Sequence, residues 1–168
     1  VVLCGPSNAG KSSLFNYFLK EDRSIVSAIP GTTRDFIEAA CNVRGIPIRL
    51  FDTAGFRGDW DNEIEEEGIK RSVALMEDAD LILYLIDGNN PPKVIDKDLI
   101  KDSRTIAIVN KSDLCPKECE GFINLSVVTG EGFYELCTLM EGLLTKDEPY
   151  KNDSLIIESS RQRVCLKR

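Results

Sequence analysis

Histidine is missing from the 168-residue sequence. Its absence excludes Ser-His-Asp triads, Cys-His nucleophiles, histidine general bases and every zinc site that needs an imidazole ligand. Long hydrophobic runs are missing too: the longest strictly apolar run covers only residues 81–86, far short of the roughly 20 residues that span a membrane. We expect no signal peptide, because the chain opens at Val1 within an apolar stretch. We therefore expect a cytoplasmic protein with no membrane contact, of which this chain is one part.

Positive charge is scarce relative to negative charge. Lys plus Arg number 21 against 28 for Asp plus Glu, which gives a formal net charge of −7 and a pI of about 4.8. Such a surface repels polyphosphate, so this segment is not expected to coat nucleic acid. The length and the hydrophobic content of 42% suffice for one domain with its own core.

The six cysteines could form disulfides, hold a metal or remain reduced. Cys115 and Cys119 are spaced like a ligand pair, but no second pair has matching spacing. Cys4 and Cys137 lie in apolar stretches, where a free cysteine packs as a small hydrophobic residue. The pattern favours reduced thiols in a cytosolic protein.

Apolar runs alternate with segments of helical periodicity along most of the chain. Residues 81–86 and 105–109 are apolar on both faces, which is typical of central strands in a parallel sheet covered by helices on both sides. The order of elements favours an α/β fold, a doubly wound and mostly parallel six-stranded sheet. We expect strands at residues 1–4, 36–43, 46–51, 81–86, 105–109 and 122–125, and helices at 12–19, 63–77, 94–101 and 131–144.

The end of the chain differs in composition from the rest. Residues 1–145 are expected to form the domain, and residues 146–153 are polar, contain a proline and are typical of a linker. Residues 154–168 have the pattern of a basic helix with few apolar partners of its own. We expect them to begin a further helical segment.

A phosphate-binding loop is indicated by residues 5–12, which read G-P-S-N-A-G-K-S and lie between a predicted strand and a predicted helix. The glycines let backbone N–H groups turn towards phosphates, and the helix N-terminus adds a favourable potential. Lys11 would neutralise the β- and γ-phosphates, and the Ser12 hydroxyl would ligate Mg²⁺. The expected phosphate-binding residues here are Asn8, Ala9, Gly10, Lys11, Ser12 and Ser13.

Two further motifs follow predicted strands. Asp52-Thr53-Ala54-Gly55 comes after residues 46–51, where Asp52 can hold Mg²⁺ through water and the Gly55 N–H can meet the γ-phosphate. Asn110-Lys111-Ser112-Asp113 comes after residues 105–109, where Asp113 can accept both donors on the guanine edge, which adenine lacks. Asn110 can address the far edge of the base and the Lys111 stem can cover its face, with Ser126, Val127 and Val128 completing the pocket.

Together the three motifs resemble those of the translation-factor-related GTPases, which have the Ras-like P-loop fold. Asn8 within the phosphate loop and Gly31-Thr32-Thr33-Arg34-Asp35 in the following loop narrow the resemblance to the G domain of the MnmE (TrmE) tRNA modification GTPases, within the TrmE-Era-EngA-like group. The resemblance covers essentially residues 1–145. Era-like and Der-like ribosome-assembly GTPases share most of the motifs and remain the alternative.

The resemblance implies a function for the whole protein. It implies a GTPase that acts as the conformational switch of a tRNA wobble-uridine modification complex, binding GTP and GDP and forming a G-domain homodimer with GTP and K⁺. It also implies an FAD-dependent partner (MnmG, or GidA) and contact with tRNA through other domains. A regulatory GTP sensor with slow hydrolysis is a further alternative.

The residue that directs the attacking water is left open by the sequence. Ras-like enzymes place a glutamine after the D-x-x-G glycine, and Phe56 stands there instead. An acidic stretch follows, which is also typical of a solvated helix start. The resemblance implies Glu65 as the catalytic glutamate, with Glu63 and Glu66 as the alternatives.

A cation beyond Lys11 and Mg²⁺ is needed for the charge of the transition state. Arg34 and Arg57 qualify by charge, but both are more typical of exposed loop residues. The resemblance implies a K⁺ ion at this place and Thr33 as a further Mg²⁺ ligand. The implied K⁺ ligands are Asn8, Ser27, Ile29 and Thr32, in a loop that Pro30 stiffens.

Overall fold

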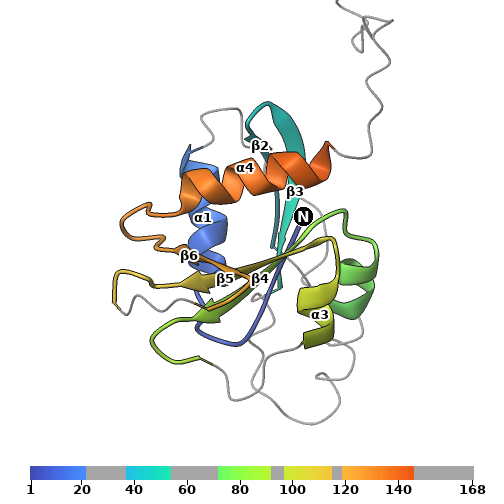
Figure 1. Cartoon of the computed structure of the whole chain (residues 1–168). Coiled ribbons are helices and arrows are strands. Elements are labelled where there is room, and N and C mark those ends of the chain that lie inside the picture. Colours follow the sequence, from blue (N-terminus) through green and yellow to red (C-terminus); the bar gives the residue numbers. More distant parts are fainter. Residues whose placement is uncertain (22–36, 54–71, 92–96, 115–118, 146–168) are drawn as a thin grey trace, which may run out of the picture.

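The computed structural model describes residues 1–21, 37–53, 72–91, 97–114 and 119–145. These residues form one six-stranded sheet in the order β2-β3-β1-β4-β5-β6, with helices on both faces (Figure 1). The strands are β1 (Val2–Cys4), β2 (Ile37–Val43), β3 (Ile46–Asp52), β4 (Ile82–Asp87), β5 (Thr105–Asn110) and β6 (Phe122–Leu125). The helices are α1 (Lys11–Glu21), α3 (Lys97–Lys101) and α4 (Phe133–Leu144), and residues 72–77 are also helical.

The sheet is parallel except for its first hairpin. β2 pairs antiparallel with β3, and β1, β3, β4, β5 and β6 pair in parallel. Arg44 and Gly45 link the hairpin strands with φ of 52° and 92°, the left-handed conformation that a two-residue turn between right-twisted strands requires. The expected α/β fold and the expected hairpin are both confirmed.

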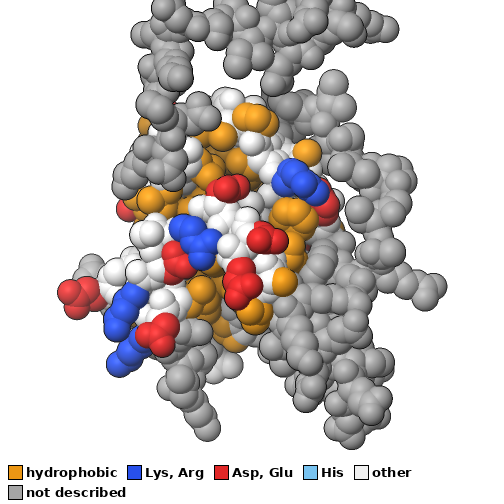
Figure 2. Space-filling model, turned by 90° about the vertical axis from the view of Figure 1, so that its right-hand side faces the viewer, with side chains coloured by type: hydrophobic (Ala, Val, Ile, Leu, Met, Phe, Trp, Pro, Cys, Tyr) orange, Lys and Arg blue, Asp and Glu red, His pale blue; other side chains and the backbone are white. Residues whose placement is uncertain are grey.

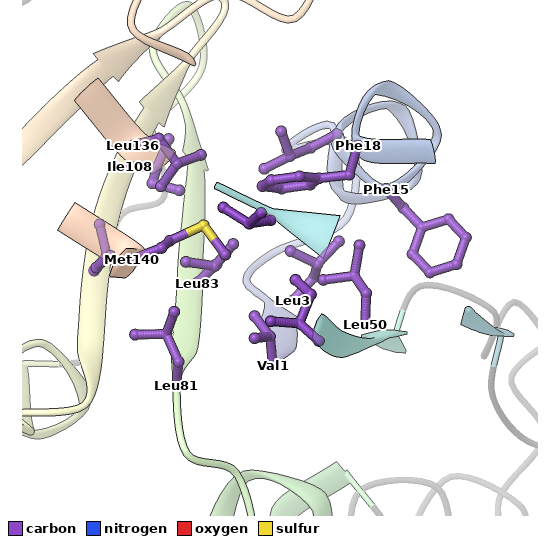
Figure 3. Packing of buried hydrophobic residues seen from close by; sticks show 14 of the residues in the cluster. Val1, Leu3, Phe15, Phe18, Leu50, Leu81, Leu83, Ile108, Leu136 and Met140 are labelled. Atoms are coloured by element: carbon purple, nitrogen blue, oxygen red, sulfur yellow. The ribbon is translucent and has the colours of Figure 1, made fainter. Parts of the chain in front are cut away.

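Side chains on the two faces of the sheet build two separate cores. Alternate residues of β4 point to opposite faces, so Leu83 and Leu85 pack beneath α1 and α4 while Ile82, Tyr84 and Ile86 pack beneath α3 and residues 72–77. All six residues of β4 are buried, which is why the strand has no polar face in the sequence. Figure 3 shows the larger core, where Phe18 from α1 and Met140 from α4 lie around the leucines of the sheet.

The last helix begins two residues later than its periodicity suggests. Gly132 stands before Phe133 with φ of 76°, a conformation that glycine adopts without strain. A Cβ atom at Gly132 would overlap the carbonyl oxygen of Asn124 on β6. The close approach of this turn to the edge strand, and not the apolar pattern of the helix, therefore determines where α4 begins.

Several expectations from the sequence can be compared with the structure only in part, because some of their residues are not described. The described cysteines Cys4, Cys41, Cys119 and Cys137 form no disulfide bond. Within the described ranges no helix is long and apolar enough to cross a membrane, and three or more His, Cys, Asp or Glu residues do not gather as a metal site. Figure 2 shows acidic and basic side chains interspersed on one face of the molecule. Cys115, the expected linker at 146–153, the expected segment at 154–168 and most of the helix expected at 63–77 lie outside the described residues.

Candidate nucleotide-binding site

The described residues of the three sequence motifs lie at one edge of the sheet, because they follow the carboxyl ends of the parallel strands β1, β3 and β5. β1 lies between β3 and β4, with Leu3 opposite Asp52 and Cys4 opposite Tyr84. On the other side of β4, Asp87 lies opposite Asn110. Ligands of open α/β sheets bind at this edge, in the crevice outside the strand ends.

The loop between β1 and α1 has the backbone of a phosphate cradle. Gly5, Asn8 and Gly10 have φ of 131°, 65° and 95°, all in the region that turns backbone N–H groups inwards. A Cβ atom on Gly5 would overlap the carbonyl oxygen of Leu85, and one on Gly10 would overlap the side-chain nitrogen of Asn110. Both glycines are therefore required by close packing as well as by backbone conformation.

Lys11 is buried, with 6% of its surface exposed, although it carries a charge. Its ammonium group donates hydrogen bonds to the carbonyl oxygens of Gly5 and Pro6 at 2.7 and 2.8 Å. The side chain thus folds back over the loop that precedes it. A phosphate oxygen is a stronger acceptor for an ammonium group than a neutral carbonyl, so the arrangement holds the cation where the phosphates of a nucleotide would lie.

Oxygen ligands suited to Mg²⁺ lie beside this loop. Ser12 is exposed at the start of α1, and Asp52 is fully buried at the end of β3, next to the strand that leads into the loop. The Thr53 hydroxyl donates a hydrogen bond to the carbonyl oxygen of Leu3 at 2.8 Å, which fixes the backbone just after Asp52. A hydroxyl and a carboxylate fit the preference of Mg²⁺ for hard oxygen donors. When bound, Mg²⁺ would neutralise charge on the β- and γ-phosphate oxygens.

The loop that follows β5 is tied to both neighbouring segments. Asn110 is 2% exposed and donates its side-chain amide N–H to the carbonyl oxygen of Ala9 in the phosphate loop at 2.8 Å. The Ser112 backbone N–H donates to the carbonyl oxygen of Leu125 at the end of β6. The expected guanine-binding loop is therefore held between the phosphate loop on one side and the last strand on the other.

Asp113 is exposed but does not swing freely. The hydroxyl of Ser126, which is fully buried, donates a hydrogen bond to Asp113 Oδ1 at 2.6 Å and accepts one from the Thr129 N–H at 3.2 Å. Ser126 therefore orients the Asp113 carboxylate from its buried side. Of the other expected pocket residues, Val127 is half-buried and Val128 is 86% exposed, so the side chain of Val128 is open to solvent.

An ion pair at the same edge was not anticipated from the sequence. Lys111 Nζ donates to Asp87 Oδ2 at 2.6 Å, and Asp87 Oδ1 accepts the N–H groups of Asn89 and Asn90. Burial works against ionisation of Asp87, but the hydrogen bonds from Lys111 and from the two backbone N–H groups outweigh it, and the pKa of this carboxyl is lowered. The available signal was an aspartate that ends an otherwise apolar strand.

The structure describes thirteen residues of the expected site, and hydrogen bonds link Asn110 to Ala9 and Ser126 to Asp113 among them. The thirteen are Asn8, Ala9, Gly10, Lys11, Ser12, Ser13, Asp52, Asn110, Lys111, Asp113, Ser126, Val127 and Val128. Six other expected site residues lie outside the described residues, and these are Ser27, Ile29, Thr32, Thr33, Gly55 and Glu65.

Comparison with known proteins assigns the chain to a family. The model of the 50S ribosome-binding GTPase family matches residues 1–111, which is more than half of the chain. The chain belongs to this family. As a member of it, the domain is a GTPase that hydrolyses GTP, and GTPases of this kind use Mg²⁺ with the nucleotide.

Curated relatives of this GTPase domain are named tRNA modification GTPase MnmE. The protein from Borrelia garinii is 41% identical over 186 aligned residues, covering 100% of this chain and 40% of the relative. The protein from Geobacter metallireducens is 42% identical over 146 residues, covering 81% of this chain and 32% of the relative. The chain therefore spans 40% of the length of the first relative and 32% of the length of the second.

A solved structure supports the fold. The G domain of the T. maritima FeoB iron transporter superposes with a TM-score of 0.61 at 26% identity, covering 85% of this chain and 96% of that domain. The expected Ras-like P-loop arrangement of a mostly parallel six-stranded sheet is confirmed.

Proposed function

We propose that this GTPase domain is the conformational switch of a tRNA wobble-uridine modification complex in the cytoplasm. The observation that carries the proposal is the identity of 41% to a tRNA modification GTPase over the whole chain, compared with 26% to the FeoB G domain. In the full-length protein, the domain would work with an FAD-dependent partner of the MnmG (GidA) type, and other domains would bind tRNA. The net charge of −7 fits a domain that leaves tRNA contact to other parts.

The proposal is tested in cells that lack the corresponding gene. The full-length protein should restore the modified wobble uridine in tRNA, measured by mass spectrometry of nucleosides, and a full-length Lys11→Ala variant should not. Restored modification by the Lys11→Ala variant at wild-type levels would separate the modification from nucleotide binding and contradict the switch role.

Ribosome assembly is the second candidate, favoured by the description of the matching family model. In that case the protein would follow the Era-like or Der-like pattern, and its output would be RNA or ribosome binding. Loss of the gene would then change the ratio of ribosomal subunits to whole ribosomes in sucrose gradients while wobble-uridine modification stays at the wild-type level.

Hydrolysis is proposed to depend on Glu65, acting on the attacking water through a bridging water. Supporting this, Phe56 occupies the place of the usual glutamine and cannot hydrogen-bond through its side chain. Glu65→Ala should lower the turnover rate by about 10²- to 10⁴-fold, the range for a lost general acid or base, and leave the affinity for GTP largely unchanged. Glu67→Ala is the matched control. If Glu63→Ala or Glu66→Ala causes the large loss instead, that residue has the role.

Potassium is proposed to supply the remaining positive charge in the transition state, with Asn8, Ser27, Ile29 and Thr32 as its ligands and Thr33 on Mg²⁺. Asn8 lies in the phosphate loop with an exposed amide side chain, which suits a cation that takes oxygen ligands. Turnover should be on the order of tenfold or more faster in KCl than in NaCl, because a missing charge at this place is costly. Equal rates in the two salts would refute the role of K⁺.

The same ligands are proposed to order a G-domain homodimer in the presence of GTP and K⁺. Light scattering of the protein with a GTP transition-state analogue should then give a dimer mass in KCl and a monomer mass in NaCl. A constant mass in both salts would exclude this dimer, and slow hydrolysis in both would favour the GTP-sensor alternative.

A further inference from the structure

Asp87 lies outside the three motifs, at the nucleotide edge, and hydrogen bonds hold both oxygens of its carboxylate. Its Oδ2 accepts a hydrogen bond from Lys111 at 2.6 Å, and its Oδ1 accepts the N–H groups of Asn89 and Asn90 at 2.9 and 3.3 Å. The Asp87 side chain is 12% exposed. Because both oxygens are bonded, the carboxylate cannot rotate away without losing contacts on one side or the other.

Lys111 is held both at its backbone and at its ammonium group. The backbone has φ of 65°, and the preceding carbonyl group, of Asn110, accepts the N–H of Gly88 at 2.9 Å. The ammonium group is bound to Asp87, and the Lys111 side chain as a whole is 34% exposed. The stem therefore runs along the surface of the site between two fixed points.

The ion pair between Asp87 and Lys111 matters for base recognition because Asp113 lies close by in the sequence. Asp113 is exposed and lies two positions after Lys111, so a mobile lysine head would be drawn to its carboxylate. An ammonium group on Asp113 would compete with the N–H donors of guanine for the same oxygens. Asp87 holds the ammonium group elsewhere, and Ser126 then orients an Asp113 carboxylate that remains available as an acceptor.

We propose that Asp87 is a positioning residue for guanine recognition: it holds Lys111 so that the lysine stem lies over the base and its charge stays away from Asp113. This rests on the proposed guanine site. Asp87 does not touch the base in this role and acts only through Lys111.

The test is a double-mutant cycle read by calorimetric titration with GDP. Asp87→Asn keeps the size of the side chain and an oxygen for the two backbone N–H groups, but it loses the ion pair. It should weaken GDP binding by about 3- to 10-fold, as expected for one coupled, partly buried pair. Lys111→Met keeps an apolar stem without the charge, and adding Asp87→Asn to Lys111→Met should cause no further loss.

Controls separate this positioning role from a general loss of structure. Asp102→Asn breaks another aspartate–cation pair, with Arg104, before β5 and at the opposite end of the sheet. It should leave GDP affinity unchanged. An equal loss from Asp87→Asn with and without Lys111→Met, or no loss from Asp87→Asn, would overturn the proposal.

Three outcomes cover the remaining cases. If Asp87→Asn does not fold, Lys111→Met alone decides, because full GDP affinity in that variant would leave Asp87 nothing to position. If Asp113→Ala binds GDP as well as the wild type, the guanine site itself is wrongly assigned. If only Asp113→Ala loses binding, the guanine site stands and the role of Asp87 falls.

Discussion

Asn110 and Ala9 are 101 positions apart in sequence, and the Asn110 side-chain amide donates a hydrogen bond to the Ala9 carbonyl oxygen at 2.8 Å. Both residues are buried. The bond joins the loop expected to bind guanine to the loop expected to bind phosphates. It therefore fixes the spacing between the two halves of the nucleotide site before a nucleotide enters.

Asn110→Ala should reduce both folding stability and nucleotide affinity. It leaves the buried Ala9 carbonyl without this donor, which costs about 1–3 kcal/mol in the free energy of unfolding. GDP binding should weaken as well, because the two loops lose their common support. Urea denaturation without nucleotide and titration with GDP measure the two effects. Asn16→Ala, on the exposed side of α1, is the control and should change neither quantity. Unchanged stability in Asn110→Ala would mean that the hydrogen bond from Asn110 to Ala9 does not stabilise the fold.

Gly10→Ala and Gly45→Ala separate backbone strain from steric overlap. The two glycines have nearly the same φ, 95° and 92°, but a Cβ atom at Gly45 meets nothing within 4 Å while one at Gly10 overlaps the Asn110 side chain. Gly45→Ala should cost about 1 kcal/mol in stability, from the strained backbone alone. Gly10→Ala should cost clearly more and should abolish tight GDP binding. Equal costs, measured by denaturation, would mean that Asn110 moves aside freely.

Ser126→Ala should weaken GDP binding with a smaller effect on the fold. The variant removes the hydroxyl that bonds Asp113 and the Thr129 N–H, so the Asp113 carboxylate loses its orientation. A loss of about tenfold in affinity corresponds to one hydrogen bond to a charged group. Thr138→Ala is the matched control, since that hydroxyl bonds a backbone carbonyl on the exposed face of α4. GDP affinity equal to wild type in Ser126→Ala would show that Asp113 needs no support.

We expect the buried thiol of Cys137 to make the folded protein less stable at alkaline pH. Burial raises the pKa of its thiol from 9.0 to about 11. The neutral thiol is thus favoured in the folded state, and stability falls as the pH rises from 9 towards 11, where the unfolded chain ionises first. The loss attributable to this residue should be about 1–2 kcal/mol.

Other groups titrate in the same range, so the comparison is with Cys137→Ala. The variant is less stable at every pH because a buried side chain is truncated. Its free energy of unfolding should nevertheless decline less steeply between pH 9 and 11 than that of the wild type. Parallel curves for the two proteins would contradict the raised pKa.

The phosphate loop and the central strands were predictable from sequence because each depends on residues that are close together in the chain. The turn that cradles phosphate is built from consecutive backbone groups, so its glycines and Lys11 form a contiguous motif. The burial of β4 on both faces similarly left a continuous apolar run. The late start of α4 was not predictable, since it depends on the approach of Gly132 to Asn124 of β6.

The guanine loop was predictable in composition but not in its contacts. The sequence predicted Asn110, Lys111 and Asp113 as site residues, yet it assigned Asn110 and Lys111 to the base alone. The structure adds partners for both, Ala9 for Asn110 and Asp87 for Lys111. Ala9 lies in the loop between β1 and α1 and Asp87 at the end of β4, and no spacing rule connects either of them to the motif.

The sequence by itself determined the fold class and the family, and it predicted which groups face a nucleotide, because hydrophobic periodicity and contiguous motifs are written along the chain. Tertiary structure alone decided how those groups are held: Asn110 against the phosphate loop, Asp113 on Ser126 and Lys111 on Asp87. The reason is that parallel pairing brings the carboxyl ends of distant strands together, and hydrogen bonds between strand ends depend on distances that one-dimensional order does not contain.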